Sequence, residues 1–194
     1  MAEEISSEEK EREEINKVPL KKLTLKIGVT AIFIAVGVVL SAFNPFGYFE
    51  LFGTKIDPFA HIMNALSGVL IGLLFSVITA TGIAIIRFSI GIGTIHAFWG
   101  GISGGVVVSI IAYFIAKKKS KFVEYAAFTE PIGTVFIGGT IAEIIVPLYG
   151  SFSFGGLIIY WSLFFGPSVV GCIIGFLILK LLKKAGYTRE TFMN

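Results

Sequence analysis

The chain has 194 residues, of which 55% are hydrophobic, and its mean hydropathy is +0.86. This apolar share is well above that of a soluble globular domain and indicates one domain embedded in a lipid bilayer. The formal net charge is only +3, and the basic residues gather at the ends of apolar segments, which fits membrane topology rather than nucleic-acid binding. The single cysteine, Cys172, lies in an apolar run and cannot form an intramolecular disulfide.

The first segment of the chain is strongly acidic. Residues 1–16 hold seven acidic side chains against two basic ones. Such a segment has no apolar face with which to build a core, so residues 1–20 are expected to form a cytoplasmic tail that is disordered or a solvated helix. It is not a signal peptide, because a signal peptide begins basic and then turns apolar.

Five apolar runs follow, and the second is too long for one ordinary span. They cover residues 27–43, 59–86, 96–116, 122–148 and 157–182. A spanning helix needs about 20 apolar residues, so the run 59–86 is either one long helix or two short helices broken near Gly72.

The distribution of lysines decides between these alternatives. Three clusters flank the first, third and last runs: Lys17, Lys21, Lys22 and Lys26; Lys117, Lys118, Lys119 and Lys121; and Lys180, Lys183 and Lys184. Cytoplasmic loops are enriched in lysine and arginine, and all three clusters lie on one side only if residues 59–86 form two helices. The sequence therefore predicts an all-α integral membrane protein, with a six-transmembrane-helix bundle over 21–186, both termini cytoplasmic, and a short C-terminal tail over 187–194.

This topology places three loops outside, at residues 44–57, 88–95 and 149–156. All three mix glycine with phenylalanine or tyrosine, so they either cover a pocket or lie in the headgroup region. Within the spans, Gly100–Gly105 contains two overlapping GxxxG spacings, and Gly171 with Gly175 gives another. Small residues four apart predict close helix packing.

The few polar residues in the spans gather towards the outer half of the bundle. His61 and Asn64 are three residues apart and share one face of the second helix. Aromatic walls with a few convergent polar groups are typical of a small-molecule pocket. The candidate ligand-binding residues are His61, Asn64, Arg87, His96, Glu143, Tyr160 and Trp161.

Alternative interpretations remain for several of these groups. Arg87 could snorkel to the interface, and His96 could cap its helix in water. Glu130 lies deeper and precedes Pro131, so it is expected to be a structural partner more than a ligand contact. On an ideal α-helix it does not share a face with Glu143, thirteen residues later, and its replacement by alanine is expected to affect ligand affinity less than replacement of His61 or Asn64.

The absence of several motifs limits the function. No GxxxxGK[ST] is present, so the chain has no ATPase of its own, and no HExxH or Cys-rich motif points to a metal or another cofactor. A passive channel is disfavoured because no polar stripe follows the length of the spans. An alternative to a binding protein is a small intramembrane enzyme that uses His61, His96 and Glu143.

Several stretches resemble a known family. The pair Ala31 and Ala35, the segments KIDPFAHIMNALSGVLIG, ITATGIAIIR and SIGIGTIHAF, the following GGISG, and TEPIGT are similar to the ThiW branch of the substrate-binding (S) components of energy-coupling factor (ECF) transporters. The resemblance covers residues 27–182. Two departures from the family pattern are Phe88 after Arg87 and Trp99 before Gly100.

The resemblance implies a non-enzymatic, multi-pass protein of the plasma membrane that imports a thiamine precursor, hydroxyethylthiazole. It also implies that Ala31 and Ala35 pack against a coupling transmembrane subunit, which works with two ATPase subunits. The proposed ligand fits the candidate pocket, because a neutral thiazole ring needs aromatic faces and a few hydrogen-bonding groups but no ion pair.

Overall fold

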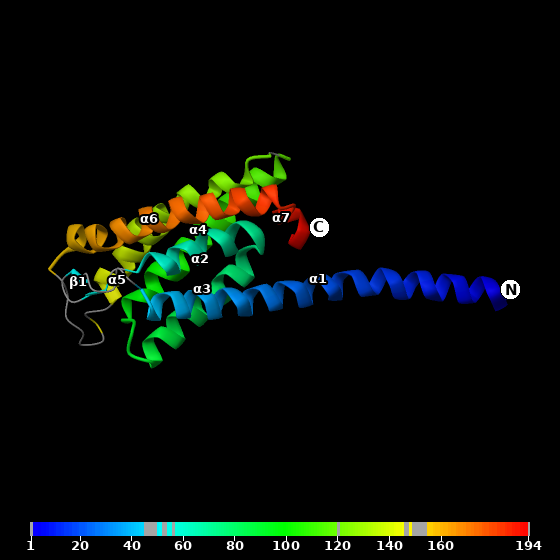
Figure 1. Cartoon of the computed structure of the whole chain (residues 1–194), viewed down its shortest axis with the longest axis horizontal. Coiled ribbons are helices and arrows are strands. Elements are labelled where there is room, and N and C mark those ends of the chain that lie inside the picture. The colour runs from blue at the N-terminus through cyan, green and yellow to red at the C-terminus, as the bar shows by residue number, and fades with distance from the viewer. Residues whose placement is uncertain are drawn as a thin grey trace.

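The computed structural model is a bundle of helices with one long helix that extends from it (Figure 1). The backbone is described at residues 2–44, 50–51, 54–55, 57–119, 121–145, 148 and 155–193, and the side chains at residues 20–44, 57–119, 121–145, 148 and 155–193. The expected outer loops 44–57 and 149–156 lie largely outside the described residues, so the hypothesis that they cover a pocket stays a prediction.

The secondary structure is almost entirely helical. The helices are α1 Ala2–Ala42, α2 Pro58–Leu70, α3 Leu73–Ser89, α4 His96–Lys117, α5 Gly139–Ile145, α6 Leu157–Lys184 and α7 Arg189–Met193. A 3-10 helix, η1 Val123–Thr129, and a π-helix, η2 Ile132–Gly138, precede α5. Two short strands, β1 Glu50–Leu51 and β2 Thr54–Lys55, pair antiparallel.

Among the residues that the structure describes, four helical segments are long and apolar enough to cross a membrane. They are Leu20–Ala42, His96–Lys117, Val123–Ile145 and Leu157–Lys184. These segments confirm the predicted class, a helical membrane protein. Helices α2 and α3 are shorter, with 13 and 17 residues.

The predicted break near Gly72 is present. Helix α2 ends at Leu70 and α3 begins at Leu73, and Gly72 between them has φ +82° and ψ −179°. Only glycine adopts this combination of angles without strain, because a side chain would collide with the backbone. The amides of Ile71 and Gly72 both donate to the carbonyl of Ser67, which closes the end of α2. The run 59–86 is therefore two helices that turn back on each other.

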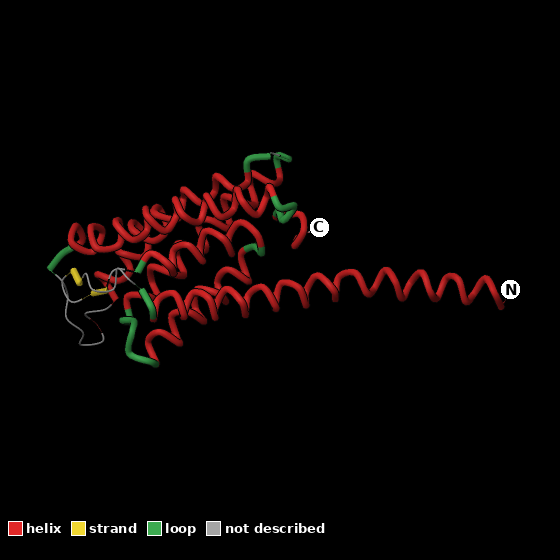
Figure 2. The backbone as a smooth tube through the Cα atoms, in the orientation of Figure 1, coloured by secondary structure: helices red, strands yellow, loops and turns green. Residues whose placement is uncertain are grey.

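Helix α2 forms the centre of the bundle. It is about 20 Å long, too short to cross a bilayer unaided. It packs against α1, α3, α4 and α6, and its side chains from His61 to Leu70 are all buried. In Figure 2, which has the orientation of Figure 1, α2 lies between the long helices α1 and α6. Its shortness is tolerated because protein, rather than lipid, surrounds it.

Glycines allow the helices around the site to approach closely. A methyl group added at Gly133 of η2 would lie 2.9 Å from the Cα of Gly104 of α4, and one added at Gly138 would lie 2.8 Å from the Cα of Gly100. On α6, a methyl group at Gly171 would lie 2.6 Å from the carbonyl of Pro58. The predicted close packing at the GxxxG spacings is confirmed at these positions.

Both ends of the described chain are helical. Helix α1 includes the acidic segment, so the backbone there is helical, and Figure 1 shows this part projecting beyond the bundle. Within the predicted short C-terminal tail over 187–194, α7 packs against the bundle. Arg189 donates to the carbonyls of Gly68 and Val69, at 3.2 and 2.7 Å, and Phe192 is buried. The last carbonyls of α2 lack helical partners, and Arg189 supplies the donor.

Candidate functional site

A fully buried carboxylate, Glu130, is the centre of a polar cluster inside the bundle. Its Oε1 lies 2.8 Å from His61 Nδ1, 3.0 Å from Asn64 Nδ2 and 2.5 Å from Thr134 Oγ1. Its Oε2 accepts a hydrogen bond from Ser168 of α6. Glu130 is 0% exposed, so these groups replace the water that a carboxylate requires. We call Glu130, His61, Asn64, Thr134 and Ser168 the Glu130 cluster.

Irregular helix geometry places Glu130 at this point. It follows the 3-10 helix η1 and precedes the π-helix η2, so the chain is wound tightly before it and widely after it. π-helical turns are uncommon in proteins, and many of those that occur lie at functional sites. Gly104 of α4 faces the cluster, and a methyl group there would collide with Glu130 Oε1 and Thr134 Oγ1. The carboxylate therefore occupies space that only a glycine leaves open.

His61 and Asn64 share a face of α2, as predicted from their spacing, and both point at Glu130. Glu130 was predicted to be a structural partner, and the structure shows that its partners include both of these candidate residues. The segment around Glu130 is not a regular α-helix with 100° per residue, because η1 and η2 have other periods. The position of Glu130 inside a predicted span was the available signal, because an ionisable group in a span normally has a function.

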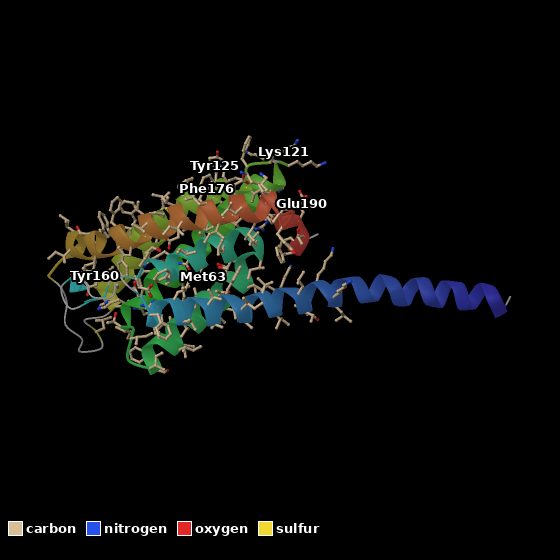
Figure 3. The ribbon with its side chains drawn as sticks, viewed as in Figure 1. Met63, Lys121, Tyr125, Tyr160, Phe176 and Glu190 are labelled. Carbon is tan, nitrogen blue, oxygen red and sulfur yellow. The ribbon has the colours of Figure 1, made fainter. Side chains whose placement is uncertain are left out.

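An aromatic layer lies beside the cluster, towards the start of α4. The rings of His96 and Tyr160 meet edge to face, with centroids 5.4 Å apart. Tyr160 is 0% exposed, and Ile95, Trp99 and Phe164 pack around it. Figure 3 places Tyr160 at the end of the bundle opposite Lys121. Helix α4 connects this aromatic layer to the Glu130 cluster, because Thr134 Oγ1 also lies 3.0 Å from the carbonyl oxygen of Gly100 on α4.

Two candidate residues lie away from this layer. Trp161 follows Tyr160 on α6 but turns to the fifth segment, where its indole N–H donates to Thr140 at 3.2 Å and its ring packs on Phe136. Successive residues on a helix point about 100° apart, so Tyr160 and Trp161 do not line the same space. Glu143 lies on α5, is partly exposed, and is not among the groups that bond to Glu130.

Arg87 forms a buried ion pair. Its guanidinium lies 2.7 Å from the carboxylate of Asp57, and both side chains are under 10% exposed. Asp57 also caps α2 by accepting from the amide of Phe59 at 2.9 Å, and it accepts from Ser41 of α1 at 2.5 Å. The pair therefore ties together α1, α2 and α3 at one end of the bundle. Neither sequence spacing nor periodicity identified Asp57 as the partner.

A small cavity of about 10 Å³ lies between α2, α3 and α4. Its lining residues are Ala60, Asn64, Ala80, Ile83, Ala84, Arg87, Ala97 and Gly101. Asn64 thus belongs to both the cavity and the Glu130 cluster. The walls are mostly alanine and glycine, and the cavity is large enough for about one water molecule.

The two residues expected to depart from the family pattern, Phe88 and Trp99, fall at different places. Phe88 is 53% exposed and its ring meets Phe98 edge to face at 6.2 Å, so it points away from the Glu130 cluster. Trp99 packs against Tyr160, and its indole nitrogen is buried without a hydrogen-bond partner among the described residues. No described group of three or more His, Cys, Asp or Glu is arranged to hold a metal ion.

Comparison with protein-family models gives one decisive match. The model described as thiamine-precursor transporter protein (ThiW) matches residues 27–185. The chain belongs to the ThiW family. Comparison with curated proteins and with solved structures gives no match.

Membership of the ThiW family defines the general role. The family is one of transporters, so the chain is a multi-pass membrane protein with a small-molecule substrate, and thiamine precursors are the substrate class. The matched range contains every residue of the Glu130 cluster, together with Asp57 and Arg87. It ends before α7, so the contact of Arg189 with α2 lies outside the part that the family model describes.

Proposed function

We propose that this ThiW protein is the substrate-binding subunit of an ATP-driven ECF-type importer in the plasma membrane, and that it binds a neutral thiazole such as hydroxyethylthiazole. The observation that carries the proposal is the Glu130 cluster: His61 and Asn64 are held by a buried carboxylate beside the aromatic layer of His96 and Tyr160. A site with few polar groups and aromatic walls suits a flat heterocycle.

The charges of the site support a neutral ligand. Arg87 is paired with Asp57, so it is not an uncompensated cation for a phosphate group. Its Nε and the indole nitrogen of Trp99 are buried donors without a partner in the described part of the chain. A ligand that offers acceptors, such as a ring nitrogen and a hydroxyl oxygen, satisfies such donors without bringing charge into the membrane.

Ligand entry requires movement of the outer ends of the helices. Hydroxyethylthiazole is far larger than one water molecule, so it does not fit a cavity of about 10 Å³. The alanines and Gly101 between α2, α3 and α4 leave small side chains at these contacts, so α4 can move away from α2 and α3 while the Asp57–Arg87 pair still holds α3 to the start of α2. We therefore expect ligand binding to rearrange this end of the bundle.

The proposed topology has six membrane passes with both termini cytoplasmic. Both ends of the chain lie at the same end of the bundle in Figure 1, which supports an even number of passes. The three lysine clusters support the cytoplasmic assignment of that end. Ala31 and Ala35 are exposed on α1, and Gly28 has open space beside it, so this face is available to the coupling subunit that acts with two ATPase subunits.

Equilibrium binding to the purified chain tests the proposal. Isothermal titration with hydroxyethylthiazole should show saturable binding without product, and Asn64→Ala should raise the Kd by about tenfold to a hundredfold, because a buried partner is lost. Ala185→Ser, at an exposed position at the end of α6, is the control and should leave the Kd unchanged. Preferential binding of the phosphorylated thiazole would show that the ligand is anionic. Conversion of the ligand would favour the enzyme that uses His61, His96 and Glu143.

A further inference from the structure

A second, much larger cavity lies at the other end of the bundle. Its volume is about 490 Å³, and it opens between the C-terminal ends of α2, α4 and α6, the start of η1, and α7. Figure 3 marks this end by Lys121 and Glu190, opposite Tyr160. Its cationic lining residues are Lys117, Lys119, Lys121, Lys183 and Arg189, and its acidic lining residues are Glu124 and Glu190.

Two of the five cations serve the fold. Arg189 donates to the carbonyls at the end of α2, and Lys183 is paired with Glu124 at 2.8 Å. The other three, Lys117, Lys119 and Lys121, make no hydrogen bond or ion pair through their ammonium groups within the described ranges. The cavity therefore has more positive charge than the contacts of Arg189 and Lys183 use.

The backbone conformation of Lys119 is a second indication that the positive charge of the cavity is functional. Lys119 has φ +52° and is the one described residue other than glycine with a positive φ. It lies just after α4, where glycine is preferred because a side chain is strained in the left-handed region. A lysine that occupies this position despite the strain supplies a cation to the cavity rim that glycine would not.

We propose that this cavity binds the phosphate headgroup of an anionic phospholipid. Lysines act as point charges that hold phosphate oxygens, and basic pockets between membrane helices on the cytoplasmic side suit such headgroups. Part of the cavity wall is apolar and is formed by Val69, Leu70 and Leu179. Tyr113, which lines it from the spanning helix α4, is 53% exposed. This combination fits a lipid, which brings an acyl chain with its phosphate.

Native mass spectrometry of the full-length protein in detergent tests the site. Phosphatidylglycerol should bind more tightly than phosphatidylcholine with the same acyl chains, because the lysines favour net negative charge. The triple variant Lys117→Gln, Lys119→Gly and Lys121→Gln should lose affinity for phosphatidylglycerol by about a hundredfold, at about fivefold for each cation. Equal binding of both lipids to the wild-type chain would overturn the proposal.

Matched variants separate the cavity from general surface charge. Lys21→Gln, Lys22→Gln and Lys184→Gln together remove the same charge from lysines outside the cavity lining and should leave lipid affinity unchanged. Lys119→Gly alone should weaken lipid binding while the Tm in lipid-free detergent is unchanged or higher, since the backbone strain is relieved. Equal losses in the two triple variants would show that no specific site exists.

Inorganic phosphate distinguishes the source of the ligand. If inorganic phosphate displaces phosphatidylglycerol at a concentration similar to that of the lipid itself, a soluble phosphate compound occupies the cavity and the lipid assignment is wrong. Weak competition by phosphate supports the lipid. The measurement requires neither the thiazole nor the coupling subunit, so it can fail while the transport proposal holds. The lipid proposal depends on the proposed topology in one respect, which is that the cavity faces the cytoplasmic leaflet of the membrane.

Discussion

Glu130 shows how a single carboxylate can organise a site within a membrane. It contacts donors from α2 and α6 and from its own segment, while α4 leaves it room at Gly104. A buried charge is tolerated only when such partners are present, so the stability of the bundle and the geometry of the site depend on the same contacts. Substitutions here must be interpreted through both stability and binding.

Glu130→Ala should destabilise the protein and weaken thiazole binding at least as much as His61→Ala or Asn64→Ala. The substitution leaves the buried donors of His61, Asn64 and Ser168 without an acceptor, at about 1–3 kcal/mol for each. Thr134→Val, which removes one hydroxyl at constant size, should cost less. Thermal unfolding in detergent and titration with hydroxyethylthiazole measure the two effects. A Glu130→Ala protein with the wild-type Tm and affinity would contradict this role.

Asp57 and Arg87 should behave as a coupled pair. Removing either partner leaves an uncompensated buried charge, so Asp57→Asn or Arg87→Gln should each cost about 3–5 kcal/mol. The double variant should lose clearly less than the sum of the two, which a double-mutant cycle of unfolding free energies detects. The pair is buried, so the coupling should change little with added salt. Additive losses would mean that the two residues act independently.

Between elements, packing at the site depends on glycine at particular positions of α4. Gly104→Ala should force α4 away from η2 and lower stability by about 1–3 kcal/mol, as overpacking does. Gly101→Ala on the same helix is the matched control, because its added methyl group would meet only the Cβ of Ala80, at 3.8 Å. Thermal unfolding of the two variants should separate them. An equal Tm for both would show that the close contact relaxes without cost.

The exposed face of α1 should affect transport without affecting ligand binding. Ala31→Trp or Ala35→Trp places a large side chain where close approach of the coupling subunit is proposed, so uptake of hydroxyethylthiazole in cells should be abolished. The Kd of the purified subunit should stay within about twofold, since both residues point out of the bundle. Val170→Trp, on an exposed face of α6, is the control. Normal uptake by both alanine variants would exclude this docking face.

For the molecule as a whole, local sequence signals predict the break between α2 and α3 but not the contacts between distant elements. The break at Gly72 was predictable because the lysine distribution and a helix-breaking residue agree. The partnership of Arg189 with α2 was not, because the bonded atoms lie 120 residues apart in sequence. The partners of Glu130 were not predicted, because most of them come from other helices, α2 and α6, and its own segment winds with three helical periods. Side-chain pairing across elements requires the tertiary structure.

Labelling of single cysteines tests the proposed topology. In a Cys172→Ala background, a cysteine at Lys118 should be labelled by a membrane-impermeant maleimide only after cells are opened, whereas a cysteine at Ser151 should be labelled in intact cells. Lys118 lies at the end of the bundle that the lysine clusters assign to the cytoplasm. Ser151 lies in the sequence between α5 and α6, in the loop that the proposed topology places outside. Cysteines near the N-terminus, at Ser6, and at the C-terminal Asn194 should behave like Lys118, because an even number of passes returns the chain to its starting side.

If Lys118 and Ser6 were labelled from opposite sides, residues 59–86 would form one pass, although α2 and α3 reverse direction at Gly72. Such a result would require a different fold in the membrane and would remove the cytoplasmic assignment of α7.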